Sequence, residues 1–160
     1  ITNCFIFMGN SRRKVEKYMV IYRLMHSYAG TETIYGDEFA LGCYSDLDII
    51  KKTIDIYRTI EGFSQFPNGF YVFEYTVNGE SDCGNEFVYV AEVYIHDEDY
   101  DFERVNCLGV FGNNADAEQC ISNFQNQNEG FINSTDLVVE CTAEKYKINE
   151  MGWKEGFNFA

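Results

Sequence analysis

The sequence predicts an α+β fold built from two tandem β-β-α-β repeats. Strand-like alternation and helical periodicity follow one another in the same order in both halves of the chain. An apolar-glycine step recurs at Leu41-Gly42 and Leu108-Gly109, and Glu-Gly-Phe recurs at 61–63 and 129–131. Such a repeat indicates two copies of one supersecondary unit, each too small to bury much surface alone. We therefore expect one domain with a pseudo-twofold, antiparallel-rich sheet and two helices on one face.

The first repeat is expected to occupy residues 19–80. Its predicted strands cover residues 19–28, 38–45 and 70–77. Ser45 and Asp48 have the spacing of a capping box, so Ser45 is expected to cap a helix. Apolar residues then recur at helical spacing, which predicts one buried helix face: Leu47, Ile50, Ile54 and Tyr57. Gly62 is expected to end this helix.

The second repeat is expected to occupy residues 85–160. Its predicted strands cover residues 87–96, 105–111 and 136–143. Asn113 or Asn114 is expected to cap the helix, and Gly130 to end it. The inward side chains of this helix are predicted to be Ala117, Cys120, Ile121 and Phe124. Residues 1–18 match nothing in the second half and are expected to be an N-terminal leader or extension.

The negative charge is concentrated in the second half of the chain. The chain has 12 Lys and Arg against 26 Asp and Glu, a formal net charge of −14. Residues 1–80 hold 8 basic and 10 acidic residues, a net of −2, whereas residues 81–160 hold 4 and 16, a net of −12. Such a surface repels nucleic acid and anionic lipid and attracts basic proteins. We expect a basic protein as partner, and neither nucleic acid nor membrane; solubility alone is the alternative explanation.

Cysteine usage and hydropathy favour a cytoplasmic protein. The six cysteines form no Cys-x-x-Cys pair, and we expect reduced thiols rather than disulfides or zinc ligands. No apolar stretch approaches the roughly 18–20 residues needed to cross a bilayer, and no convincing secretory signal is present. The sequence also has no glycine-rich phosphate loop and no nucleophile elbow. We therefore predict no cofactor and no catalytic residue.

Four short motifs stand out. They are His26-Ser27-Tyr28, Gly42-Cys43-Tyr44-Ser45, Pro67-Asn68-Gly69-Phe70 and Trp153-Lys154-Glu155-Gly156-Phe157. Together they resemble an uncharacterised small bacterial domain family, present here as a diverged tandem duplication. The first repeat keeps the front motifs and the second keeps the closing one, but Asp97 replaces Ser27 and the Pro-x-Gly-Phe turn is missing from the second. The resemblance implies a fold unit and a bacterial or phage source, and no activity.

An acidic loop between the first two strands of the second repeat is the predicted partner-binding site. Its residues are Asp97, Glu98, Asp99, Tyr100, Asp101, Phe102 and Glu103. Alternate carboxylates also begin calcium loops, but Phe102 stands where such a loop needs glycine and Leu108 where it needs glutamate. We therefore expect either a solvated hairpin loop or an acidic prong in which Tyr100 and Phe102 anchor a partner.

The two histidines supply an alternative hypothesis. His26 and His96 fall at similar places in the two repeats. If the pseudo-twofold axis brought them together, Glu74 and Glu140 would complete a set suited to a divalent metal or to acid–base catalysis. The simpler interpretation is a strand-end histidine satisfied by a neighbouring tyrosine or backbone group, because a duplication copies structural residues as well.

The function expected from the sequence is non-catalytic binding. We expect an inhibitor or immunity-type protein whose acidic second repeat covers a basic surface of a toxin, a nuclease or another nucleic-acid-handling protein. The alternative is a small metal-binding protein or enzyme that uses His26 and His96. Trp153 is expected to pack over the sheet as a C-terminal lock rather than to form a ligand platform.

Overall fold

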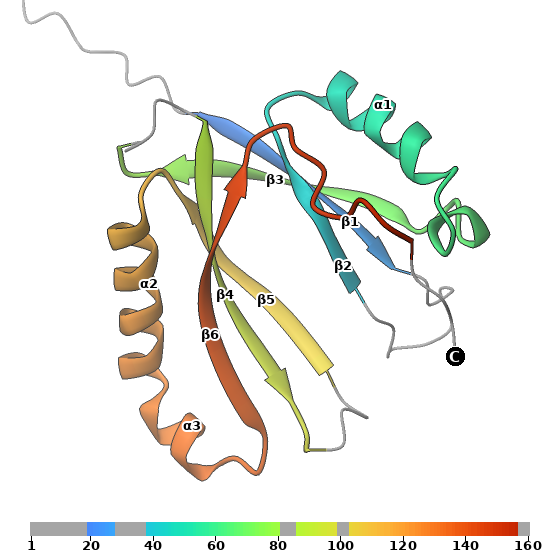
Figure 1. The fold of residues 1–160 in the computed structure, drawn as a ribbon. Helices are drawn as coiled ribbons and strands as arrows, with labels where there is room; N and C mark the ends of the chain where they lie inside the picture. Colours follow the sequence, from blue (N-terminus) through green and yellow to red (C-terminus); the bar gives the residue numbers. More distant parts are fainter. Residues whose placement is uncertain (1–18, 28–37, 81–85, 99–102, 157–160) are drawn as a thin grey trace, which may run out of the picture.

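The described residues fold into one six-stranded sheet with three α-helices, an α+β architecture (Figure 1). The computed structural model describes residues 19–27, 38–80, 86–98 and 103–156. In chain order, its elements are β1 (Val20–Ser27), β2 (Glu38–Tyr44), α1 (Leu47–Tyr57), the 3-10 helix η1 (Phe63–Gln65), β3 (Phe70–Asn78), β4 (Phe87–His96), β5 (Glu103–Phe111), α2 (Asn114–Gln127), α3 (Glu129–Ser134) and β6 (Val138–Lys147). None of these helices has the length and apolar character needed to span a bilayer.

The strand order is β2-β1-β3-β5-β4-β6, and the first strand of each half lies in the middle of its half. β1 pairs antiparallel with β2 and β3, and β4 pairs antiparallel with β5 and β6. The halves join through a short parallel contact in which Val77 pairs with Val110 and Asn78 with Phe111. The sheet is therefore mixed, with a single parallel junction among its described strands.

A register shift interrupts both halves at the apolar-glycine step. Leu24 of β1 pairs with Gly42 and the next residue with Ala40, so Leu41 is the extra residue of a β-bulge. In the second half, Ala91 pairs with Gly109 and the next residue with Cys107, so Leu108 takes that place. A bulge increases the local twist of a strand pair, which is consistent with the strong curl of this sheet (Figure 1).

The helix caps differ in part from those expected. Asp46, not Ser45, caps α1, because its Oδ1 accepts a hydrogen bond from Asp48 N at 2.6 Å. Asn113 caps α2 as predicted and accepts from Asp116 N at 2.8 Å. Gly130 does not end this helix: α2 stops at Gln127, and Gly130 lies inside the short helix α3.

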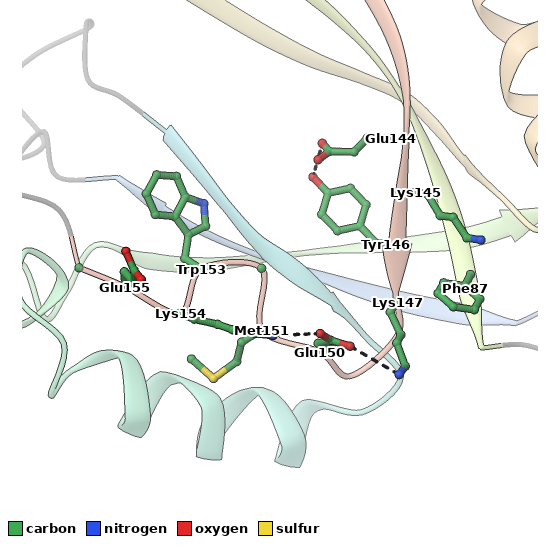
Figure 2. A pocket seen from close by; sticks show the side chains of 12 residues that line it. Phe87, Glu144, Lys145, Tyr146, Lys147, Glu150, Met151, Trp153, Lys154 and Glu155 are labelled. Atoms are coloured by element: carbon green, nitrogen blue, oxygen red, sulfur yellow. Dashed lines mark hydrogen bonds and ion pairs between the residues drawn. The ribbon is translucent and has the colours of Figure 1, made fainter.

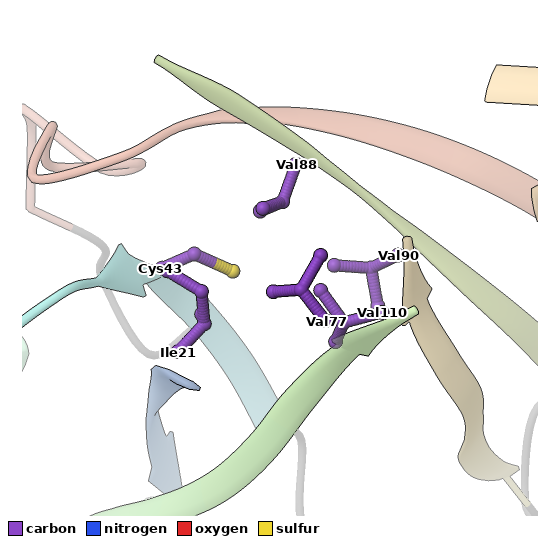
Figure 3. Packing of buried hydrophobic residues seen from close by; sticks show 6 residues of the cluster. All are labelled: Ile21, Cys43, Val77, Val88, Val90 and Val110. Carbon is purple, nitrogen blue, oxygen red and sulfur yellow. The ribbon is translucent and has the colours of Figure 1, made fainter. Parts of the chain in front are cut away.

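Alternation along β1 divides the apolar residues between two cores. Leu24 faces α1 and packs with Ile50, Tyr57 and other buried residues of the first half. Ile21 faces the opposite side, where Cys43, Val77, Val88, Val90 and Val110 complete a second cluster (Figure 3). The two halves of the curled sheet meet in this second cluster, so we call the face that carries Ile21 the inner face. α1 lies against the outer face.

A C-terminal strap, residues 148–156, closes the curl. Asn149 N donates to Cys43 O and Gly152 N to Leu41 O, each at 2.9 Å, so the strap lies along β2. Asn149 Nδ2 donates to Ser45 Oγ at 3.0 Å, so the serine hydroxyl is bonded to the strap and not to the start of the helix. The end of the second half is thereby bound to the first half.

Candidate functional site

The predicted partner-binding residues lie where β4 leads into β5. Asp97 and Glu98 directly follow β4, and Glu98 is exposed. Glu103 is the first residue of β5 and pairs with His96. Asp99, Tyr100, Asp101 and Phe102 lie outside the described residues. Both ends of the acidic loop are therefore at the tip of the β4–β5 hairpin, far along the chain from the strap.

Exposed carboxylates continue from this tip over the second half. They lie on α2, α3, β6, the strap and the connection before β6: Asp116, Glu118, Glu129, Asp136, Glu140, Glu144, Glu150 and Glu155. Within the described part of this half, Lys147 pairs with Glu86 and Glu150, and Lys154 pairs with Glu150. These exposed pairs use few of the carboxylates, so the described surface of this half is strongly acidic.

His26 is a packed residue of the outer face. Its ring meets Phe63 and Phe70 edge-on, at centroid distances of 5.0 and 4.6 Å. Nε2 lies 3.0 Å from Phe66 O, a contact that requires the proton on Nε2. Burial lowers the pKa of His26, and the hydrogen bond to Phe66 opposes that shift only in part. These contacts match the simpler, structural interpretation of this histidine.

His96 lies on the inner face, because it follows Glu92 by four residues along β4. β3 and β5 separate its strand from that of His26, and the two histidines lie on opposite faces. Glu74 pairs with β1 and Glu140 with β4, so neither carboxylate bridges the histidines. Across residues 19–27, 38–80, 86–98 and 103–156, no three His, Cys, Asp or Glu side chains gather closely enough to hold a metal ion. The structure does not bring the predicted four-residue set together.

A buried ion pair crosses the inner face. Arg23 Nη1 lies 2.6 Å from Glu92 Oε1, and the two side chains are 4% and 8% exposed. The Arg23 guanidinium also lies over the Tyr146 ring, 5.8 Å from its centroid. Burial by itself would lower the pKa of Arg23, but the adjacent Glu92 carboxylate outweighs burial and the pKa is raised. Arg23 is therefore positively charged, and its contact with Glu92 links the two halves of the sheet.

Two thiols flank this pair. Cys43 is the β2 partner of Arg23, and Cys107 is the β5 partner of Glu92. Burial raises the pKa of Cys43 to about 12 and also raises that of Cys107. Both thiols are protonated at neutral pH and are poor nucleophiles. The inner face thus holds a structural polar cluster rather than an activated cysteine.

Trp153 joins the strap to the outer core. Its ring meets Phe39 edge-on at 4.9 Å, and its backbone N–H donates to Tyr57 Oη at 3.2 Å. These contacts support the expectation of a C-terminal lock. A pocket of about 870 Å³, here called the edge groove, lies beside it (Figure 2). Its walls are Phe87, residues 144–147 of β6 and residues 150–156 of the strap.

Comparisons with protein-family models, with curated proteins and with solved structures find no match to this chain. The resemblance to a small bacterial domain family therefore remains a prediction.

Sequence reasoning missed both the Arg23–Glu92 pair and the edge groove. A signal for the pair was present, since each lies inside an otherwise apolar or aromatic strand, and charges are rarely buried there without a partner. The partner itself could not be read from the sequence, because the two residues are 69 positions apart. The groove depends on the path of the strap after β6, and no local sequence motif predicts that path.

Proposed function

We propose that this protein is a non-catalytic binding protein of inhibitor or immunity type, from a bacterium or phage, whose acidic second half covers a basic surface of a partner. The observation that carries the proposal is the excess of exposed carboxylates over α2, α3, β6 and the strap, which few described lysines neutralise. Partners of matching chemistry are toxins, nucleases and other nucleic-acid-handling proteins, because these present basic surfaces. The proposed site of action is the cytoplasm.

The acidic loop is the proposed anchor of this interface. A cluster of carboxylates at a hairpin tip raises the association rate with a basic partner through long-range attraction. Tyr100 and Phe102 among the carboxylates supply apolar contact area, since aromatic residues are frequent at the centres of interfaces. The acidic loop and the acidic surface of the helices would together cover a larger basic patch on the partner than either could cover alone.

The proposal includes an ancient duplication, with the two halves related by a pseudo-twofold axis. Two observations support it: each half has the same strand pairing, and each has a bulge at its apolar-glycine step. When the halves are aligned at those bulges, His26 lies two residues after Leu24, whereas His96 lies five residues after Ala91. The two histidines are therefore not equivalent positions in this alignment. The halves then differ mainly in charge, with a net of −2 for residues 1–80 and −12 for residues 81–160. Such a difference in charge is expected if only the second copy binds the partner protein.

A basic peptide of defined sequence tests the proposal whichever protein the partner is. Isothermal titration calorimetry would measure the affinity of the whole chain for a deca-arginine peptide at low and at physiological salt. We expect affinity to fall about tenfold or more over that range, because salt screens exposed charges. Absence of binding, or an affinity that does not change with salt, would overturn the proposal.

A further inference from the structure

The edge groove has the geometry of a peptide site. We propose that it binds an extended peptide segment that adds a strand to the free edge of β6 and carries acidic residues at alternate positions. The segment belongs to a partner protein. This site lies at the free edge of β6 and the strap, whereas the anchor proposed above is the acidic loop after β4, so the two proposals are tested separately.

The backbone of β6 offers unused hydrogen-bonding groups to the groove. Ile148 N donates to Glu86 O at 2.9 Å, so Ile148 directs its backbone groups toward β4. In an antiparallel ladder such residues alternate with residues whose N–H and C=O point away. By this alternation, the backbone N–H and C=O of Tyr146 and Glu144 also point toward β4, whereas those of Lys145 point away from it. No described strand lies beyond β6, so these groups of Lys145 are free to pair with an added strand.

The charges of β6 define one face of the expected peptide. Lys145 and Lys147 are two residues apart and project from the same face of the strand. Lys145 Nζ lies 4.0 Å from the centroid of the Phe87 ring and forms no ion pair with a described residue. The carboxylates near Lys147, at 3.6 and 3.8 Å, are exposed and weakly held. Acidic residues at positions i and i+2 of an added strand would lie opposite the two lysines.

Lysines and carboxylates share the walls of the groove, and they differ in how far each is already paired. Residues 81–160 contain only four Lys or Arg, and three of them, Lys145, Lys147 and Lys154, line the groove together with Glu144, Glu150 and Glu155. Glu144 accepts a hydrogen bond from Tyr146 Oη at 2.7 Å, and Glu150 pairs with Lys147 and Lys154. Lys145, which forms no ion pair with a described residue, is therefore the lysine of the groove that is open to an acidic side chain of the peptide.

The opposite face of the expected peptide is apolar. Tyr146 projects into the space between β6 and the strap, and Met151 and Trp153 line the strap side (Figure 2). β-branched side chains pack well against aromatic rings across paired strands. Strand addition gains affinity from main-chain hydrogen bonds and specificity from such alternating contacts. The expected motif therefore alternates acidic and β-branched residues.

Fluorescence of Trp153 reports binding directly, because it is the only tryptophan of the chain and lines the groove. The probe is the blocked peptide Thr-Asp-Val-Asp-Val-Thr, titrated into the whole protein. We expect a saturable change in emission, a loss of binding when the central amides of the peptide are N-methylated, and weaker binding of Thr-Lys-Val-Lys-Val-Thr. Equal binding of the N-methylated peptide would overturn strand addition. An absence of any emission change would also overturn it, and would mean that the lysines only protect the edge of β6 from pairing with other strands.

A pair of variants separates the groove from overall charge. Lys145→Glu is expected to weaken binding of the acidic peptide about fivefold or more, because a like charge then faces one of its two acidic residues. Lys52→Glu makes the same change of charge on the exposed surface of α1 and is expected to alter affinity less than twofold. Equal effects of the two variants would contradict the proposal. Neither substitution touches the acidic loop, so binding of deca-arginine distinguishes failure here from failure of the proposed function.

Discussion

Arg23 and Glu92 stand 69 residues apart in the sequence and meet at 2.6 Å in the interior, one from each half of the protein. The Val77–Val110 junction joins the halves by only a short stretch of parallel pairing. Much of the contact between them is therefore made by the inner core, this ion pair and the strap. The halves are expected to unfold as one unit.

Removing one partner of the ion pair should be more harmful than removing both. Glu92→Leu leaves the Arg23 charge buried without compensation, and we expect it to lower the free energy of unfolding by about 3–5 kcal/mol. The double variant Arg23→Met/Glu92→Leu leaves no buried charge and should recover most of that loss. Urea denaturation of the two single variants and the double variant measures the coupling. Additive losses would show that the two charges do not depend on each other.

Protonation of His26 should destabilise the fold in acid. Burial lowers its pKa below the ordinary value of 6.5, so the unfolded chain binds the proton more tightly than the folded one. The stabilising contribution is fully present above pH 6.5 and is lost as the pH falls from there through the folded-state pKa. NMR titration of the His26 ring should give a midpoint below 6.5. His26→Gln keeps an amide donor for Phe66 O and should remove this part of the pH dependence of stability. A titration midpoint of the His26 ring at or above 6.5 would contradict the prediction.

Two glycines should respond in opposite directions to alanine. Gly42 has a φ of +131°, and a Cβ there would lie 2.7 Å from Glu150 O of the strap. Gly42→Ala is therefore expected to cost about 1–3 kcal/mol of stability. Gly130 lies in α3 with open space around it, so Gly130→Ala should be neutral or stabilise by up to about 1 kcal/mol. Thermal denaturation of both variants compares them, and a neutral Gly42→Ala would show that the strap does not pack closely on β2.

Loss of the Trp153 ring should loosen the strap. The ring meets Phe39 at 4.9 Å and is 36% exposed, so Trp153→Ala is expected to cost about 1–3 kcal/mol, less than a fully buried aromatic. Phe131 on α3 is 48% exposed and serves as the matched control. Phe131→Ala should change stability by less than about 0.5 kcal/mol. Equal effects in urea denaturation would mean that Trp153 is not a lock.

Local patterns predicted the elements well. Alternation placed a strand at 87–96, where β4 lies, and helical spacing from Leu47 to Tyr57 marked α1. Ala117 is fully buried on α2, as its place in the helical pattern requires. Errors fell at helix ends, where hydrogen bonds to distant residues decide the cap, and at the last strand, which was expected at 136–143 and lies at Val138–Lys147. The side chain of Asn149, 104 residues away, bonds the Ser45 hydroxyl, and that distant contact removed Ser45 from its expected role.

The site was less predictable because it depends on which strand faces meet. A matching position of His26 and His96 along the sequence suggested a pair, but alternation from Leu24 and Glu92 puts them on opposite faces. The edge groove likewise depends on the path of the strap after β6. The acidic character of the second half needed no such geometry, since composition alone fixes the sum of charges.

The most direct measurement compares charge reversal in the acidic loop with the same reversal elsewhere. One variant replaces Asp99, Asp101 and Glu103 with Lys, and the other replaces Glu61, Glu74 and Glu80, three exposed acids of the first half. Both raise the net charge equally, so only position differs. If the loop anchors a basic partner, its reversal lowers the affinity for deca-arginine by about tenfold or more, and the control lowers it by less than about threefold. Equal losses in the two variants would contradict the binding role of the loop.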